Sequence, residues 1–176
     1  MKKQLIGLSI LGVILTGCSS AAQAVTVRPA VAIVKTNQTL MQTVHAQARA
    51  QQVDSVISKL KHQVGRTWYV FSGATPSGWD CSGLTMWAYE QLGVELPHSA
   101  NKQAKVGVAV ITPQVGDLVL FGYKGTNTYF HASIYIGNNK VIHAGFKPGQ
   151  RTAILDLSSA SVKNTKMKFV RVNLNG

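Results

Sequence analysis

Cys81 is the residue of this chain best suited to nucleophilic chemistry. It follows a segment rich in glycine and proline at residues 73–78, and the run Trp79-Asp80-Cys81-Ser82-Gly83-Leu84 predicts that a helix begins there. The N-terminus of a helix presents unpaired N–H groups and a partial positive charge. We therefore expect a lowered thiol pKa, a reactive thiolate and backbone donors that can stabilise an oxyanion.

A cysteine nucleophile works with a histidine that handles the proton, and the chain has five histidines: His45, His62, His98, His131 and His143. His45 and His62 lie in polar stretches and are expected at the surface, whereas the loop residue His98 is ambiguous. His131 and His143 lie on two expected strands, which can bring both imidazoles to the same end of one sheet face. The pattern permits a Cys–His–His site, and it leaves open the alternative of an inert buried cysteine with histidines bonded to the backbone.

The elements that must position these residues change in character along the chain. Apolar residues recur every three or four positions from Ala50 to Val64, which predicts a helix, and a second helix is expected from Asp80–Cys81 to Gly93. Strands are expected at Asp117–Phe121, Phe130–Ile136, Lys140–His143 and Lys168–Val172, with a hairpin turn at Gly137-Asn138-Asn139. Helices followed by strands predict an α+β domain with a mainly antiparallel sheet.

The N-terminal residues have the features of an export signal. Two lysines precede an apolar stretch that is too short for a mature membrane span, and it ends in Leu15-Thr16-Gly17-Cys18. This ending resembles the bacterial lipobox, in which the cysteine is lipidated and the preceding segment removed. We therefore expect a signal peptide at 1–17, a lipid anchor on Cys18, a tether over 18–48 and one domain at 49–176. Two alternatives remain open: cleavage near Ala24 that releases a secreted protein, or an incidental Cys18.

The charge balance limits the classes of partner. The chain carries 18 Lys+Arg against 6 Asp+Glu, a formal charge of +12, with only 14% charged residues. Removal of 1–17 takes away two lysines and no acid, which leaves +10. Such a surface favours anionic envelope polymers and phospholipid headgroups, or is simply a solvated face. Export and the lack of a binding motif argue against nucleic acid. Two cysteines exclude a disulfide-dense scaffold and a four-cysteine zinc site.

Six segments resemble, in the family order, the NlpC-type cell-wall cysteine peptidases. Together they cover roughly residues 50–172. The matching segments are Trp68–Gly73, Trp79–Leu84, Leu96-Pro97 with Gln103, Gly116–Val119, His131–Gly137 and Val141–Ala144. The resemblance implies a papain-like fold with a nucleophile helix on an antiparallel sheet. Its nucleophile matches Cys81, its general base matches His131, and the residue that orients the base matches His143. No metal or other cofactor is implied.

The resemblance also implies a substrate. Family members cut peptidoglycan stem peptides, usually between γ-D-glutamate and a diamino acid. Tyr69 matches a tyrosine that assists the oxyanion, while Asp80 and Ser82 match positions that contact the substrate's amine or peptide end in some members. Two departures stand out: Trp68 and Phe71 flank the tyrosine where the family often has other residues, and His98 stands where it often has arginine. We expect Trp68 and Phe71 to pack in the core, and His98 leaves the stem-peptide preference open.

The leading hypothesis is an exported, lipid-anchored peptidoglycan endopeptidase. Ser19 directly follows Cys18, which resembles the outer-membrane sorting pattern of lipoproteins and would place the domain in the periplasm. A catalytically silent wall-binding lipoprotein is the first alternative. An amidase or transpeptidase on the same fold is the second.

Overall fold

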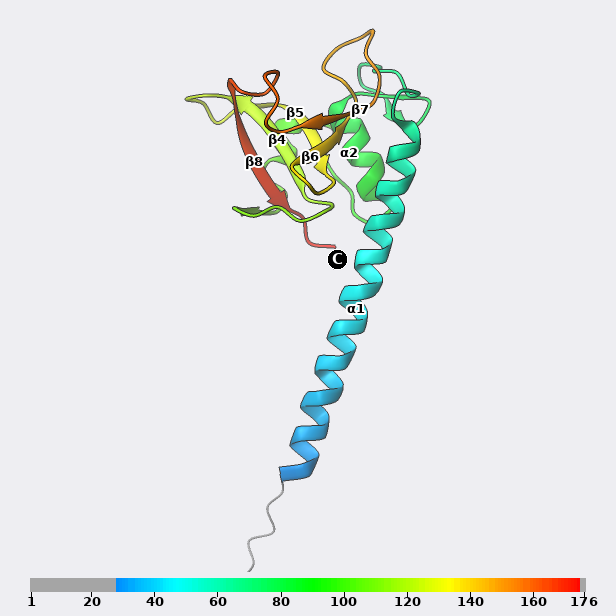
Figure 1. The fold of residues 1–176 in the computed structure, drawn as a ribbon, viewed down its shortest axis with the longest axis vertical. Helices are drawn as coiled ribbons and strands as arrows, with labels where there is room; N and C mark the ends of the chain where they lie inside the picture. Colours follow the sequence, from blue (N-terminus) through cyan, green and yellow to red (C-terminus); the bar gives the residue numbers. More distant parts are fainter. Residues whose placement is uncertain (1–27, 175–176) are drawn as a thin grey trace, which may run out of the picture. The chain divides into compact units, whose positions relative to one another are not determined.

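The computed structural model describes residues 28–174, and the chain divides into two compact units, Met1–Leu40 and Met41–Gly176. The expected signal peptide, Cys18 and the Ala24 cleavage site lie outside the described residues. Figure 1 shows the elements in chain order. They are α1 (Arg28–Gln63), β1 (Ala74–Thr75), β2 (Gly78–Trp79), α2 (Cys81–Glu90), α3 (Ala100–Gln103), β3 (Val108–Val110), β4 (Leu118–Tyr123), β5 (Tyr129–Tyr135), β6 (Lys140–His143), β7 (Ala153–Asp156) and β8 (Thr165–Arg171).

Helix α1 begins 22 residues before the expected start at Ala50. The reason is physical: residues 37–48 are all exposed, so no apolar period marks this part of the helix. Periodicity appears only where the helix joins the core, through Val56, Ile57 and the fully buried Leu60. Part of the expected tether is therefore helical, and the boundary at residue 49 stays a prediction. Among residues 28–174, no helix has the length and apolarity needed to cross a membrane.

The main sheet is antiparallel throughout, in the order β3-β8-β4-β5-β6-β7. All four expected strands are present, and the expected α+β class is confirmed. The hairpin turn between β5 and β6 is confirmed as well, with positive φ angles at Gly137, Asn138 and Asn139. The edge strands β3 and β7 and the small β1–β2 sheet were missed, because each has only two to four residues and offers no clear alternation.

The sheet separates two apolar clusters. The larger cluster joins α1 and α2 to one face, where Leu84, Ala88 and Leu60 are fully buried beside inward residues of β4, β5 and β6. The smaller one, on the other face, is formed by Val119, Phe121, Val141, Leu157 and Val162. Helix α2 is thus held against the sheet by its whole apolar stripe, which fixes the position of its first residue, Cys81.

The two ends of α1 provide a matched pair for stability. Leu60→Ala is expected to destabilise the protein by about 2–5 kcal/mol, because it opens a cavity in the larger cluster. Leu40→Ala, where the leucine is 59% exposed, is expected to change stability by less than about 0.5 kcal/mol. Urea unfolding of both variants checks this. If Leu60→Ala, like Leu40→Ala, changed stability by less than about 0.5 kcal/mol, the C-terminal end of α1 would not join the core.

Candidate active site

Asp80 fixes the N-terminus of α2. Its Oδ1 accepts hydrogen bonds from Gly83 N at 2.7 Å and Ser82 Oγ at 3.0 Å, and its Oδ2 accepts from Ser72 N at 3.1 Å. His98 Nε2 lies 3.0 Å from the same Oδ1. The carboxylate is therefore an N-cap that also holds the preceding loop and the segment that carries His98.

A close backbone approach holds the loop against the helix. A Cβ at Gly83 would lie 1.9 Å from Gly73 O, and one at Gly73 would lie 2.4 Å from Gly78 O. Asp80 N also donates to Gly73 O at 3.0 Å. Only glycine fits at these two positions, so the segment that carries Tyr69 is brought up to the start of α2.

A buried polar network supports the first turn of α2 from α3. Thr85 Oγ1 donates to Gln103 Oε1 at 2.7 Å, and Gln103 Nε2 donates to Ser82 O at 3.0 Å and Pro97 O at 2.9 Å. Gln103 is fully buried, and each of its polar atoms has a partner. Because a satisfied buried network permits few alternative arrangements, α3 fixes the depth at which Cys81 sits.

Cys81 is buried at the start of α2, and its thiol lies against the backbone of β5. Sγ donates to Phe130 O at 4.0 Å, so the thiol sits beside the segment that carries His131. The expectation of a lowered thiol pKa is wrong in direction. Burial raises the pKa of Cys81, and the nearby Asp80 carboxylate raises it further, although backbone N–H groups, chiefly that of Ala132, oppose this.

His131 and His143 meet as expected from the pairing of β5 with β6. His131 Nε2 lies 3.1 Å from His143 Nδ1, and the two rings meet edge to face. Desolvation lowers the pKa of His131 to about 3, with His143 contributing, and lowers the pKa of His143 to about 4. If Nε2–H of His131 donates to His143, the Nδ1 atom of His131 is unprotonated and is the position that can accept a proton.

Tyr69 lies beside the start of α2, in an isolated bridge with Trp79. Burial raises its pKa, and the charges of Cys81 and Asp80 raise it further, which places the phenol close enough to both to sense them. Its hydroxyl therefore stays protonated at neutral pH and is a hydrogen-bond donor. The structure thus brings together the residues expected to form the site, while their individual roles stay predictions.

The remaining sequence expectations have mixed outcomes. Trp68 and Phe71 are 47% and 79% exposed, so the expectation of core packing is wrong for both. Arg151 covers one face of the Trp68 ring at 3.9 Å, which explains how this tryptophan tolerates exposure. His45 and His62 are exposed, as expected. His98 is the partner of Asp80, which no feature of the sequence had indicated.

Two residues near the histidines were missed by the sequence analysis. Phe146 contacts both imidazole rings, and Gln150 accepts a hydrogen bond from the Phe146 backbone. The only available signal was the Gly145, Pro148 and Gly149 spacing, which indicates a loop and not a role.

The arrangement suits acyl transfer without a metal. The buried thiol of Cys81 and the N–H groups of Cys81 and Ser82 lie at the start of α2, and the thiol contacts the β5 backbone at the residue before His131, whose imidazole is neutral. Within residues 28–174, no group of three or more His, Cys, Asp or Glu side chains is placed to hold a metal ion.

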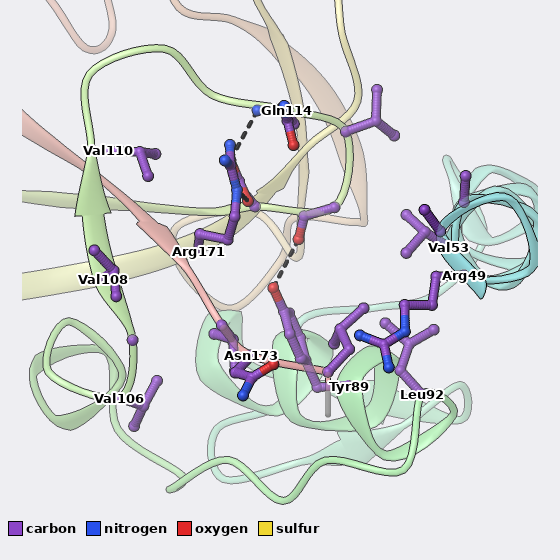
Figure 2. A pocket seen from close by; sticks show the side chains of 18 of the residues that line it. Arg49, Val53, Tyr89, Leu92, Val106, Val108, Val110, Gln114, Arg171 and Asn173 are labelled. Atoms are coloured by element: carbon purple, nitrogen blue, oxygen red, sulfur yellow. Dashed lines mark hydrogen bonds and ion pairs between the residues drawn. The ribbon is translucent and has the colours of Figure 1, made fainter. Parts of the chain in front are cut away.

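A large cavity lies elsewhere in the described part of the chain. It has a volume of about 800 Å³ and is lined by the C-terminal part of α1, the end of α2, β3 and the end of the chain. Figure 2 shows Tyr89 and Arg171 at its wall. Tyr89 Oη donates to Gly116 O, and Arg171 forms an ion pair with Asp117. Tyr89 lies near the C-terminal end of α2, opposite the end that carries Cys81, so this cavity is not the candidate active site.

Comparison with known proteins assigns the fold to one family. The sequence model of the NlpC/P60 family matches residues 65–171, more than half of the chain. The chain belongs to the NlpC/P60 family. A solved NlpC/P60 family protein from Bacillus cereus superposes with a TM-score of 0.61 at 28% identity, over 68% of this chain and 39% of that one. The papain-like fold expected from the sequence is thereby confirmed.

Two curated relatives of this NlpC/P60 chain have names that state an activity. A probable endopeptidase of Mycobacterium tuberculosis is 42% identical over 92 residues, which span 51% of this chain and 23% of the relative. The murein DD-endopeptidase MepS/murein LD-carboxypeptidase of Escherichia coli K12 is 42% identical over 84 residues, which span 46% of this chain and 44% of that protein. The chain therefore spans less than half the length of these relatives.

Both imidazoles of the NlpC/P60 domain are expected to stay neutral down to about pH 5. Their pKa values of about 3 and about 4 lie below the ordinary value of 6.5, so protons bind the unfolded chain more tightly. The contribution of the two neutral imidazoles to the stability of the folded state is therefore complete above about pH 6.5. It is lost as the pH falls toward 4, because protonation then favours the unfolded chain. An NMR titration of the ring signals of His131 and His143 checks the two values. A midpoint near pH 6.5 for either ring would contradict them.

Proposed function

We propose that this NlpC/P60 domain is a cysteine peptidase that cuts peptidoglycan stem peptides. The observation that carries the proposal is the position of the Cys81 thiol, which contacts the β5 backbone at the residue before His131. The imidazole of His131 is paired with that of His143, and the Tyr69 phenol is close enough to the thiol to sense its charge. The endopeptidase names of the two curated relatives support the same reaction class. A silent wall-binding domain would have no need of a desolvated imidazole beside a buried thiol.

The geometry supports a two-step mechanism. His131 Nδ1 takes the proton of the Cys81 thiol as the sulfur attacks the substrate carbonyl, and His143 orients the imidazole. The N–H of Cys81 and the Tyr69 hydroxyl stabilise the oxyanion. The imidazolium gives its proton to the leaving amine, and the acyl-enzyme forms. A water molecule deprotonated by His131 then hydrolyses the thioester and restores the thiol.

Two bonds are candidates for cleavage. We propose first the bond between γ-D-glutamate and the diamino acid, which the resemblance to the family implies. The second candidate is a D,D bond of the peptide cross-link, because the Escherichia coli relative is named a DD-endopeptidase. Asp80 and Ser82 lie at the start of α2, where they would contact the peptide end of either substrate. Oδ1 of Asp80 already has three donors within 3.0 Å, so Oδ2 is the atom that remains for a substrate ammonium.

Digestion of purified sacculi tests the nucleophile, the base and the bond. Cys81→Ala and His131→Ala are expected to lower the rate at least about 1,000-fold, since each removes a group that the chemical step requires. His62→Ala, which removes an exposed histidine of α1, serves as the matched control and should keep the wild-type rate. Mass spectrometry of the released muropeptides identifies the cut. Equal digestion by wild type and Cys81→Ala would contradict the assignment of Cys81 as the nucleophile. Glycan products that have lost the whole stem peptide would indicate an amidase.

We propose in addition that the chain is exported and anchored through a lipid on Cys18. The run Leu15-Thr16-Gly17-Cys18 after an apolar segment supports this, and the charge of +10 after removal of 1–17 suits an anionic envelope. The anchor would keep the domain at the membrane that faces its substrate.

Metabolic labelling with a palmitate analogue in a bacterial host tests the anchor. Wild type is expected to incorporate the label, and Cys18→Ala is expected to lose it entirely, because the acceptor thiol is gone. Cys81→Ala is the matched control, since it removes the other cysteine and should keep the label. Absence of label in the wild type would favour release after cleavage near Ala24.

A further inference from the structure

The loop between β6 and β7 places an aromatic ring against both histidines. The ring centroid of Phe146 lies 4.4 Å from that of His131 and 4.8 Å from that of His143. Phe146 itself is 39% exposed, so one side of its ring faces solvent and the other faces the imidazoles. His131 and His143 are 2% and 4% exposed. Phe146 is thus part of the layer that separates this pair from water.

Gln150 holds Phe146 in this position. Its side-chain Oε1 accepts a hydrogen bond of 2.6 Å from Phe146 N, and its own N–H donates to Lys147 O at 3.2 Å. A Cβ at Gly145 would lie 2.7 Å from the Cβ of Gln150, so the two ends of the loop pack closely. Gly145 has a φ of 86°, which only glycine adopts readily. The loop is closed on itself by these contacts.

The same residue ties the loop to the tyrosine of the site. Gln150 O accepts from Tyr69 N at 2.9 Å, and Thr152 N donates to Thr67 O at 2.9 Å. Thr152 Oγ1 in turn accepts from Nε1 of the fully buried Trp79 at 2.7 Å. The segment at 150–152 is therefore bonded both to the segment that carries Tyr69 and to the residue that precedes Asp80.

The geometry points to Phe146 and Gln150 as positioning residues of the catalytic site. The ring of Phe146 shields the His131–His143 pair from water, and Gln150 keeps the ring in place while it fixes the backbone of Tyr69. The inference rests on the proposed function, because it assigns these residues to the proton-accepting half of that mechanism. Neither residue is proposed to touch the reacting atoms.

Among the residues around His131 and His143, Phe146 is the one whose side chain can be truncated to let water reach the imidazoles. The titratable neighbour of His131 is His143 on β6, and the Cys81 thiol at the start of α2 lies against the adjoining backbone. Strand β4 contributes Phe121, an apolar ring 5.8 Å from that of His131. The loop contributes Phe146. Its two charged residues, Lys147 and Arg151, are both exposed, and Arg151 lies over the ring of Trp68. A change at Phe146 therefore alters hydration without the removal of a charge.

Four variants test the inference through the titration of the histidines. Phe146→Ala is expected to raise the midpoint of the His131–His143 pair toward 6.5 by at least about one unit, because it admits water. The acidic limb of kcat/KM on a stem-peptide substrate should move upward by the same amount, since the base must be neutral. Phe146→Leu, which keeps an apolar cover, should stay near the wild type. Gln150→Ala should shift the midpoint in the same direction, and so should Gln150→Met, which keeps the length of the side chain but removes the acceptor for Phe146 N without adding a charge.

The controls separate this inference from the proposed function. Lys147→Ala changes an exposed side chain of the same loop and should leave the midpoint unchanged. NMR of the imidazoles requires no substrate, so it reports on the shield even if sacculi are not cut. An unchanged midpoint in folded Phe146→Ala would overturn the role of Phe146, and an unchanged midpoint in folded Gln150→Met would overturn that of Gln150. If the wild type does not cut stem peptides, that result counts against the proposed function alone.

Discussion

The site depends on one carboxylate, that of Asp80. It caps α2 through Gly83 N, holds the preceding loop through Ser72 N and binds His98. Each of these contacts fixes a different segment relative to the first turn of α2, where Cys81, the proposed nucleophile, lies. An N-cap alone contributes about 1 kcal/mol. Its larger consequence is geometric, because without it the N–H groups of Cys81 and Ser82 would have no fixed direction for an oxyanion.

The sequence was sufficient where local chemistry decides the structure. Periodicity and turn residues indicated α2, β4, β5, β6 and β8, and the alternation on β5 placed His131 on the face where it meets His143. It was insufficient for the N-terminal part of α1, because residues 37–48 are all exposed and so leave no apolar pattern. The short edge strands β3 and β7 are formed by pairing with neighbours and not by their own composition.

Properties that arise from burial escaped prediction for the same reason. A helix N-terminus does favour a thiolate, and the backbone N–H groups that lower the pKa of Cys81 are present. Desolvation outweighs them in the folded protein, and the amount of desolvation is not a local property of the run from Trp79 to Leu84. Phe146 and Gln150 were missed likewise, because their importance comes from what lies opposite them in space.

Burial shifts the pKa values of Cys81 and His131 in opposite directions, and both shifts favour the uncharged form. It raises the pKa of the Cys81 thiol and lowers that of His131, so both are uncharged before substrate binds. A preformed thiolate–imidazolium pair would have to offset the desolvation of two ions, which is a large cost in a site this closed. In the proposed mechanism, charge therefore develops only as the thiol proton moves to His131 during attack. The N–H groups of α2, the protonated Tyr69 and the His143 ring would then stabilise the transition state more than the ground state, and this difference is what accelerates a reaction.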